Sequence, residues 1–229
     1  MSMSLTVSAM LAAESHGPPL DYSFKELKKV TDILDDVPFS GTTRSRAVAK
    51  ASEQNREGDG GDTAADGVNS RPHELMALPS FKRAELTKLN SVCLRLGNNL
   101  FNTLKGLDGV ANEVLDDPAR LYWLDVSHNR LTAIESVLLR FRNLKVLYFH
   151  GNQVSKLSEV DKLSRLDGTL LKVTLQANPI EELRNYRVHV FSVLPNLKKL
   201  DNGGITIVDR DRAMVWSAAR EARRRMREG

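Results

Sequence analysis

Four segments of the chain share one spacing of apolar positions. The pattern is L-x-x-L-x-L-x-x-N-x-L, and the first segment lacks its leading leucine. The copies recur about every 22 to 30 residues, a period typical of solenoids built from stacked coils. We therefore predict a repeat architecture here. The four segments are residues 93–101, 121–131, 144–154 and 170–180.

Each repeat contains a short predicted strand, in which two apolar residues flank one outward residue, as Leu124 and Val126 flank Asp125. Successive strands would stack into a parallel sheet. The chain then turns, and an asparagine amide at the turn pairs with backbone groups whose burial unpaired costs ~1–3 kcal/mol each. We interpret these residues as a structural ladder: Asn99, Asn129, Asn152 and Asn178.

Apolar residues at helical spacing separate the predicted strands and would close each coil on its outer side. The pattern resembles the leucine-rich repeat (LRR). It predicts an α/β fold, a short LRR solenoid of about four repeats plus a C-terminal cap. Parallel strands would form the concave face, and helical or 3-10 segments the convex face. The convex positions are Leu107, Val110, Val114 and Leu115; Val137, Leu138 and Phe141; and Val160, Leu163 and Leu166.

Composition divides the chain into four regions. Residues 1–39 are predicted to form an N-terminal arm with a short amphipathic helix, since apolar positions from Phe24 to Val37 recur at helical spacing. Residues 40–78 are rich in Gly, Asp and Ser and predict a flexible linker. The LRR domain with its cap would span 79–208, and a basic helix 209–229. The helix of the arm either packs on its own domain or serves as a tethered docking segment.

The segment 185–212, NYRVHVFSVLPNLKKLDNGGITIVDRDR, resembles the LRR-cap motif. That motif occurs in phosphatase-regulator LRR proteins, the spliceosomal A-prime protein and the axonemal dynein light-chain LRR protein. The resemblance implies that these residues seal the last repeat, as the open end of a solenoid requires. We expect Trp216 to pack there as well. The matching residues are Tyr186, Arg187, Leu194, Pro195, Leu197, Leu200, Asp201 and Arg210.

A wider resemblance covers most of the chain. PPLDYSF (18–24), LGNNLFNTL (96–104), VLYFHGNQVSKLSEVDKL (146–163) and the cap, in this order, resemble a family of small LRR proteins of cilia and flagella. The PPLDYSF box lies outside the general LRR pattern. The resemblance implies an axonemal location. The Gly/Asp-rich linker and the Arg-rich C-terminus depart from the family, so no partner of those segments is implied.

Composition adds little to this picture. The 229 residues, 41% of them hydrophobic, suffice for one buried core plus tails, and a net charge of +4 does not by itself indicate nucleic-acid binding. A single cysteine, Cys93, and the lack of Asn-x-Ser/Thr acceptors fit a reducing compartment, the cytoplasm. No Lys or Arg precedes the weakly apolar start, so we expect no secretory leader. We also expect no membrane contact, because no stretch approaches the ~20 apolar residues of a membrane span.

Outward strand positions predict a binding face for a partner protein. Trp123 is its proposed anchor, because folding alone poorly explains an indole on the outer side of a strand. Tyr148 would lie beside it. The alternative is that the protein's own N-terminal arm covers Trp123. The predicted partner-binding residues are Arg95, Trp123, Asp125, His128, Val146, Tyr148, His150, Lys172 and Gln176.

No pattern in the sequence indicates catalysis. His128 and His150 lie in adjacent repeats, but no third residue in a matching position predicts a metal site. Gly203 and Gly204 predict a turn, not a phosphate loop, and no Ser or Cys nucleophile has a paired base. We therefore expect no catalytic residue, no metal and no cofactor, and the protein is predicted not to be an enzyme.

The C-terminal arginines predict either a solvated charged helix or a surface that docks on acidic partners. Tubulin's acidic tails and a nucleic-acid backbone both fit. Recognition of bases is not expected, because no aromatic residues are interleaved with the arginines. These residues are Arg220, Arg223, Arg224, Arg225 and Arg227.

The function predicted first is a non-catalytic scaffold, a structural component of the ciliary or flagellar axoneme that binds axonemal proteins through its concave face. Two alternatives follow from the cap motif. One is a regulatory subunit of a protein phosphatase, although its relatives use more repeats. The other is a component of an RNA–protein complex.

Overall fold

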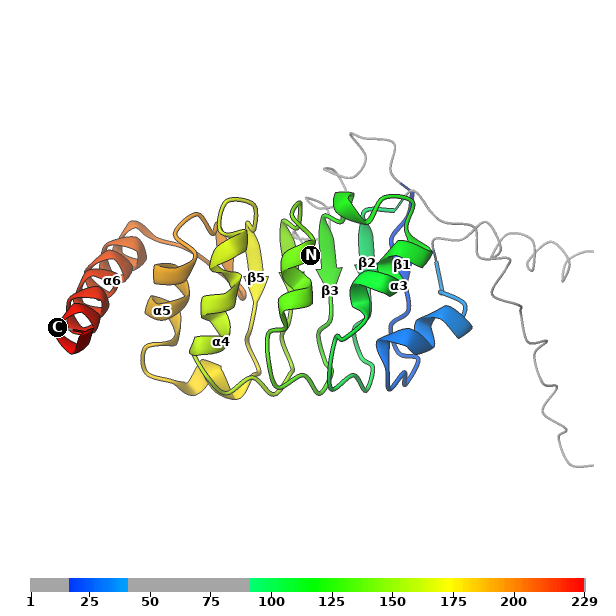
Figure 1. Cartoon of the computed structure of the whole chain (residues 1–229), viewed down its shortest axis with the longest axis horizontal. Coiled ribbons are helices and arrows are strands. Elements are labelled where there is room, and N and C mark those ends of the chain that lie inside the picture. Colours follow the sequence, from blue (N-terminus) through cyan, green and yellow to red (C-terminus); the bar gives the residue numbers. More distant parts are fainter. Residues whose placement is uncertain (1–16, 41–90, 229) are drawn as a thin grey trace, which may run out of the picture.

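A computed structural model describes residues 17–40 and 91–228, and it confirms the predicted α/β LRR solenoid (Figure 1). One seven-stranded sheet runs through it in chain order. β1 to β6 pair in parallel, and β7 turns back antiparallel to β6. The strands are β1 (Leu20–Asp21), β2 (Cys93–Arg95), β3 (Trp123–Asp125), β4 (Val146–Tyr148), β5 (Lys172–Thr174), β6 (Lys199–Leu200) and β7 (Gly203–Gly204).

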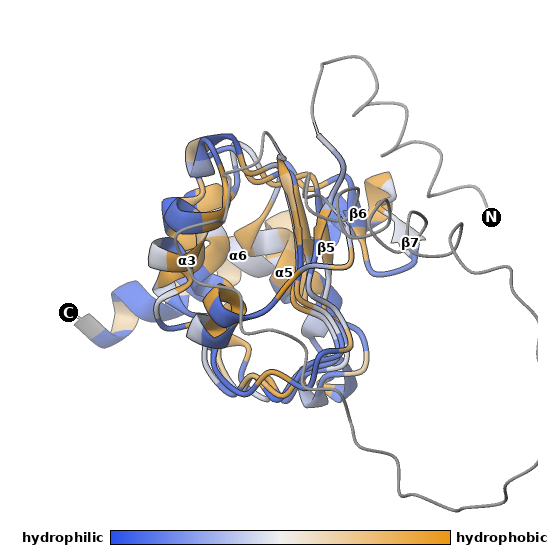
Figure 2. Cartoon of the chain, turned by 90° about the vertical axis from the view of Figure 1, so that its right-hand side faces the viewer, coloured by the Kyte–Doolittle hydropathy of each residue, from blue (hydrophilic) through white to orange (hydrophobic). Residues whose placement is uncertain are grey.

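Helices cover one face of the sheet, and the opposite face is called the concave face below (Figures 1 and 2). α6 lies beyond α5, at the end of the solenoid opposite β1. The α-helices are α3 (Leu107–Val114), α4 (Ser158–Asp161), α5 (Tyr186–Val193) and α6 (Ile207–Glu228). The 3-10 helices are η1 (Val30–Asp35), η3 (Pro118–Arg120), η4 (Ser136–Arg140), η5 (Lys162–Leu166) and η6 (Pro179–Glu182).

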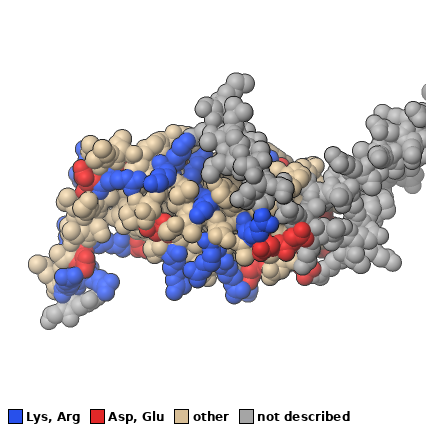
Figure 3. Space-filling view, turned by 90° about the horizontal axis from the view of Figure 1, so that it is seen from above, with Lys and Arg blue, Asp and Glu red and all other residues tan. Residues whose placement is uncertain are grey.

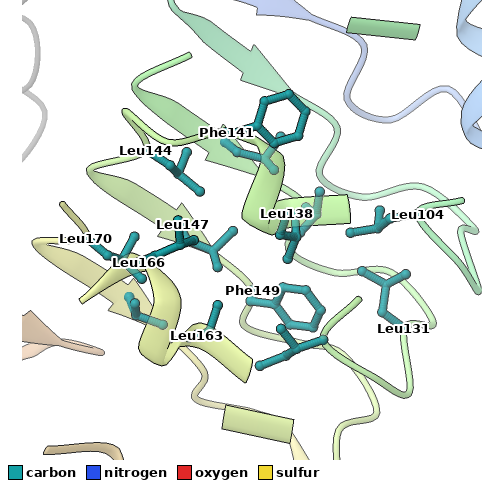
Figure 4. Close-up of a cluster of buried hydrophobic side chains, with 14 of the residues drawn as sticks. Leu104, Leu131, Leu138, Phe141, Leu144, Leu147, Phe149, Leu163, Leu166 and Leu170 are labelled. Carbon is teal, nitrogen blue, oxygen red and sulfur yellow. The ribbon is translucent and has the colours of Figure 1, made fainter. Parts of the chain in front are cut away.

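The core lies between the sheet and the helices. Each strand contributes its inward leucine-type residues, such as the fully buried Leu147 and Phe149 of the β4 repeat. Figure 4 shows these two side chains directed toward Leu138 of η4 and Leu163 of η5. Burial of each such side chain stabilises the fold by ~1.5–3 kcal/mol, so the repeated leucines hold adjacent coils together.

The solenoid begins earlier in the chain than the expected residue 79, so the boundaries 1–39 and 79–208 are wrong. Leu20 pairs in register with Leu94, and Tyr22 and Leu27 occupy the next two apolar positions of the repeat. Residues 17–40 are therefore the first coil, not an arm. The signal was hidden because Lys25 replaces the asparagine and residues 41–90 separate this coil from the next.

The amphipathic helix expected over residues 24–37 is shorter than predicted. The structure forms a six-residue 3-10 helix, η1, and its Val30 and Ile33 are buried. Phe24 and Val37 lie outside it and are exposed. Of the two open alternatives, η1 packs on its own domain, against α3. The predicted linker at 40–78, apart from Ser40, lies outside the described residues.

Both edges of the sheet carry an antiparallel addition. At the N-terminal edge, Phe39 N–H donates to the carbonyl of Asp21 at 2.7 Å, and Asp21 N–H donates to Ser40 at 3.3 Å. At the other edge, β7 occupies the free side of β6. These short additions pair backbone groups that an open edge would offer to other chains.

The cap closes the C-terminal end. The Tyr186 hydroxyl donates to Asp201 Oδ2 at 2.8 Å, and Asp201 Oδ1 accepts from the backbone N–H groups of Leu175 and Gln176. The Arg210 guanidinium donates to the Leu197 carbonyl at 2.9 Å and to that of Pro195. One tyrosine, one aspartate and one arginine thus bond the cap to the last repeat and to itself. Trp216 is partly buried on α6, which packs against α5.

Candidate partner-binding face

Two rows of outward side chains run across the strands on the concave face. Trp123 stands in register with Cys93, Val146 and Lys172. The next row contains Tyr148, one strand away from Trp123 along a diagonal. The Trp123 and Tyr148 rings meet edge to face, with centroids 5.5 Å apart and an interplanar angle of 73°. Both side chains are partly buried, and their contact forms the centre of the face.

The aromatic contact continues through two histidines. The Tyr148 ring lies 6.0 Å from the His150 ring, which lies 4.9 Å from the His128 ring at an angle of 88°. Lys172 Nζ donates to the Tyr148 hydroxyl at 2.9 Å and lies 4.6 Å from the ring centroid. Trp123, Tyr148, His150 and His128 therefore form one continuous band, called the aromatic strip below.

Backbone conformation places His128 at the end of this strip. The residue before each ladder position has a positive φ, which is 51° at His128 and 68° at Gly151. A Cβ on Gly151 would lie only 2.5 Å from the His128 ring. Glycine at 151 thus meets two requirements: it tolerates the left-handed backbone, and it leaves room for the imidazole of His128.

The asparagine ladder runs beneath the strip and fixes the turns that carry it. Asn129 shows the pattern: its Oδ1 accepts from Phe101 N–H at 3.1 Å, and its Nδ2 donates to the carbonyls of Leu96 and Val126. Each amide therefore bonds its own coil to the preceding coil. Asn99, Asn152 and Asn178 make the equivalent bonds in their repeats.

His150 is held in place and is predominantly neutral near pH 7. Its Nδ1 lies 2.8 Å from Thr174 Oγ1, within hydrogen-bonding distance. Burial lowers the pKa of His150, and the charge of His128 lowers it further, whereas Asp125 and Asp201 oppose the shift. A neutral imidazole is compatible with the neighbouring aromatic rings and suits an interface that excludes water.

Some predicted residues offer little surface to a partner. Val146 is 6% exposed and Asp125 is 8% exposed. Asp125 Oδ1 accepts from both the backbone N–H and the hydroxyl of Ser127, so it holds a turn. Arg95 pairs with Asp21 at 2.7 Å, and Gln176 is partly buried beyond His150. The accessible face therefore contains fewer residues than the predicted set.

Two residues around the strip were not among those predicted. Asp21 holds Arg95, and the exposed Lys199 extends the row of Lys172 onto β6. Alignment of LDYSFKEL with the repeat pattern, with Lys25 in place of asparagine, would have placed Asp21 beside Arg95.

The described residues show little reactive chemistry. Burial raises the pKa of Cys93 to about 12, so its thiolate is scarcely populated near pH 7. Within residues 17–40 and 91–228, no three His, Cys, Asp or Glu side chains are grouped as metal ligands. In the same part of the chain, no helix has the length and hydropathy of a membrane span.

Arg220 and Arg225 of the tail pair with carboxylates within the chain. Arg220 Nη2 pairs with Asp161 Oδ2 at 2.9 Å, joining α6 to α4, and Arg225 pairs with Glu221 along the helix. Arg223, Arg224 and Arg227 are exposed, and Figure 3 shows basic and acidic side chains side by side at the end of the molecule that α6 forms. The predicted basic surface is thus smaller than the five arginines suggest.

Comparison with known proteins gave consistent relatives. No family model matches the sequence. Leucine-rich repeat-containing protein 51 of Macaca mulatta is 35% identical over 199 residues, which are 87% of this chain and 84% of the relative. The Homo sapiens protein of that name is 34% identical over the same shares. U2 small nuclear ribonucleoprotein A′ of Saccharomyces cerevisiae is 30% identical over 96 residues, 42% of this chain and 40% of that protein.

Among solved structures, the Drosophila melanogaster SNF/U2A′ complex matches with a TM-score of 0.47 and 24% sequence identity. The match covers 59% of this chain and 74% of that chain.

Proposed function

Because the chain belongs to the family of leucine-rich repeat-containing protein 51, we propose that it is a scaffold that holds a partner protein with its aromatic strip. Membership of an LRR family makes it a protein-interaction module. The family resemblance read from the sequence is thereby confirmed. The edge-to-face pair of Trp123 and Tyr148 carries the choice of surface, since aromatic side chains dominate interface energetics.

The strip has the structure of an interface anchor. Its aromatic rings hold one another, so little side-chain entropy remains to be lost when a partner binds. Lys172 and the exposed Lys199 flank the rings on one side, and Arg95 with Asp21 on the other. An apolar centre with a charged rim matches the usual anatomy of a protein interface.

The proposed site of action is the axoneme of cilia and flagella, with axonemal proteins, tubulin among them, as partners. The motifs shared with the small ciliary LRR family support this location. We expect the protein to remain with salt-extracted axonemes of ciliated cells. Recovery entirely in the soluble cytoplasmic fraction would contradict the proposal.

Proximity labelling tests the surface. Trp123→Ala and Tyr148→Ala in tagged protein should each remove the same subset of labelled neighbours, because loss of an anchor costs ~2 kcal/mol or more of binding free energy. Glu113→Ala is the control, since this exposed residue lies on the helical face. An unchanged set of neighbours in both aromatic variants, with folding retained, would exclude the strip as the interface.

A second candidate is a component of an RNA–protein complex, suggested by the similarity to yeast U2 small nuclear ribonucleoprotein A′. This function predicts RNA-dependent co-purification and, for direct contact with RNA, binding that weakens steeply with salt. Retention of the same partners after ribonuclease treatment would favour the axonemal scaffold.

A further inference from the structure

Exposed large apolar side chains concentrate on the last helix. Five of the nine such residues in the described part of the chain belong to α6. An apolar surface that a monomer leaves to water commonly marks an interaction site. The five are Ile207, Val208, Met214, Val215 and Met226.

One face of α6 is already used by the fold. Ala213 is buried, Trp216 is partly buried, and Arg220 reaches Asp161 of α4. These residues lie three or four positions apart and so share a side of the helix. Figure 2 shows the C-terminal part of α6 extending beyond the other helices. The neighbouring side of α6, which carries Val208, Val215 and Met226, lies at the edge of this packed face and remains exposed.

That exposed side follows a heptad spacing. Val208, Val215 and Ala222 recur every seven residues, and Arg212, Ala219 and Met226 form a second series offset by four. Alternating steps of three and four residues place both series on one seam, as in a coiled coil. Val208, Val215 and Met226 are 55%, 71% and 84% exposed. Beside the seam, a groove of about 450 Å³ is lined by Val188 and other residues of α5 and α6.

The charges along α6 select an antiparallel partner. Asp209 and Asp211 lie near its start, and Arg223 and Arg225 lie near its end. In an antiparallel pair of identical helices, the seam layers become Val208 with Met226, Arg212 with Ala222, and Val215 with Ala219. The flanking positions then place Asp211 opposite Arg225 and Asp209 opposite Arg223. A parallel pair would instead bring the two arginine-rich ends together, which costs free energy by like-charge repulsion.

We propose that α6 is a dimerisation helix that pairs antiparallel with α6 of a second copy of this chain. The 22-residue helix is about 33 Å long, enough for three seam layers on each side of a two-fold axis. An interface of one helix pair is small, so the dimer should be weak and reversible. Because α6 lies at the end of the solenoid (Figure 1), this pairing does not involve the strands that carry the aromatic strip.

Sedimentation velocity over a concentration series tests this inference on the full chain. The wild-type mass should rise from 25.5 kDa toward twice that value. Val215→Glu, at the centre of the seam, should weaken the dimer at least tenfold. Met214→Glu is the matched control, because Met214 is 68% exposed but lies off the seam. A wild-type chain that stays monomeric at its highest soluble concentration, or equal weakening by both variants, would overturn the proposal.

A charge exchange tests the orientation. Asp211→Arg and Arg225→Asp should each weaken the dimer severalfold, and the double variant should recover most of the loss, because the opposite-sign contact is restored. Circular dichroism confirms that each variant keeps its helix. Additive losses in the double variant would exclude the antiparallel register. The result is independent of the aromatic strip, since Trp123→Ala should leave the dimer unchanged.

Discussion

In each of the four later repeats, one asparagine side chain bonds to backbone groups that a sharp turn leaves without backbone partners. The Asn129 amide contacts backbone groups of its own coil and of the preceding coil, all within 3.1 Å. Its side chain is almost fully buried, so water does not replace these bonds. The residue before it, His128, adopts a left-handed backbone and belongs to the aromatic strip. One turn thus connects the stability of the solenoid to its candidate binding face.

Asn129→Ala should destabilise the protein by about 3 kcal/mol, because several buried backbone groups lose their partner at ~1–3 kcal/mol each. Urea unfolding followed by circular dichroism measures the change. Asn143→Ala is the control: its exposed side chain makes one bond, to Ala119, and its loss should cost about 0.5 kcal/mol or less. Equal effects of the two substitutions would contradict a structural role for the ladder.

Among the elements, the two C-terminal helices are joined to the repeats by a partly exposed cluster of one histidine, one aspartate and one arginine. His189 Nε2 of α5 lies 3.0 Å from Asp161 Oδ1, and Arg220 of α6 pairs with the other oxygen. Burial raises the pKa of Asp161, but the hydrogen bond from Arg220 and the charge of His189 lower it below its usual value. The cluster therefore holds α4, α5 and α6 together while Asp161 is ionised.

The cluster predicts a loss of stability at mildly acidic pH. Burial lowers the pKa of His189 below 6.5, although Asp161 opposes this shift. As the pH falls through 6.5, the unfolded chain therefore binds more protons than the folded chain. The contribution of neutral His189 to the free energy of unfolding is complete above pH 6.5 and declines below it. Thermal unfolding between pH 7.5 and 5.5 should show a falling Tm, and a smaller fall in His189→Gln. An identical slope in the variant would rule out His189 as a source.

At the scale of the whole molecule, the solenoid is a row of coils in which each coil contacts its neighbours. The first coil, residues 17–40, joins the second through β1 and β2 although residues 41–90 intervene. Ile33 of η1 is fully buried, and η1 packs against α3. The N-terminal segment is thus part of the cooperative fold, and it covers core that the second coil would otherwise expose.

Ile33→Ala should lower the free energy of unfolding of the whole domain by about 2–5 kcal/mol, the usual cost of a buried isoleucine. Far-UV circular dichroism in urea should show a single transition at a lower midpoint. The exposed Lys28 provides the control variant, Lys28→Ala. A separate early transition, with the main one unmoved, would instead describe an independent arm.

Most of the repeat architecture could be predicted from the residues. The pattern around Leu124, Val126 and Asn129 is local, because strand alternation and turn bonding recur within eleven residues. The first coil could not be found in this way, since Lys25 breaks the pattern and its pairing partner lies beyond residues 41–90. The cap was found through its resemblance to a known motif.

The candidate face could likewise be predicted only in part. Alternation along a strand identifies Tyr148 and Asp125 alike as outward residues. Side-chain packing then makes them different: Asp125 turns to Ser127 and is buried, whereas Tyr148 meets Trp123 and Lys172. The contacts of Tyr148 join residues more than twenty positions apart, so no local period encodes them.

The sequence by itself determined the number and spacing of the later repeats, the inward leucines and the ladder, because those depend on spacing within a coil. Tertiary structure alone decided where the solenoid begins, which outward residues form a continuous strip, and which side of α6 remains exposed to solvent. The physical reason is that these three features depend on the proximity of distant segments, which long-range pairing and burial establish only when the coils stack.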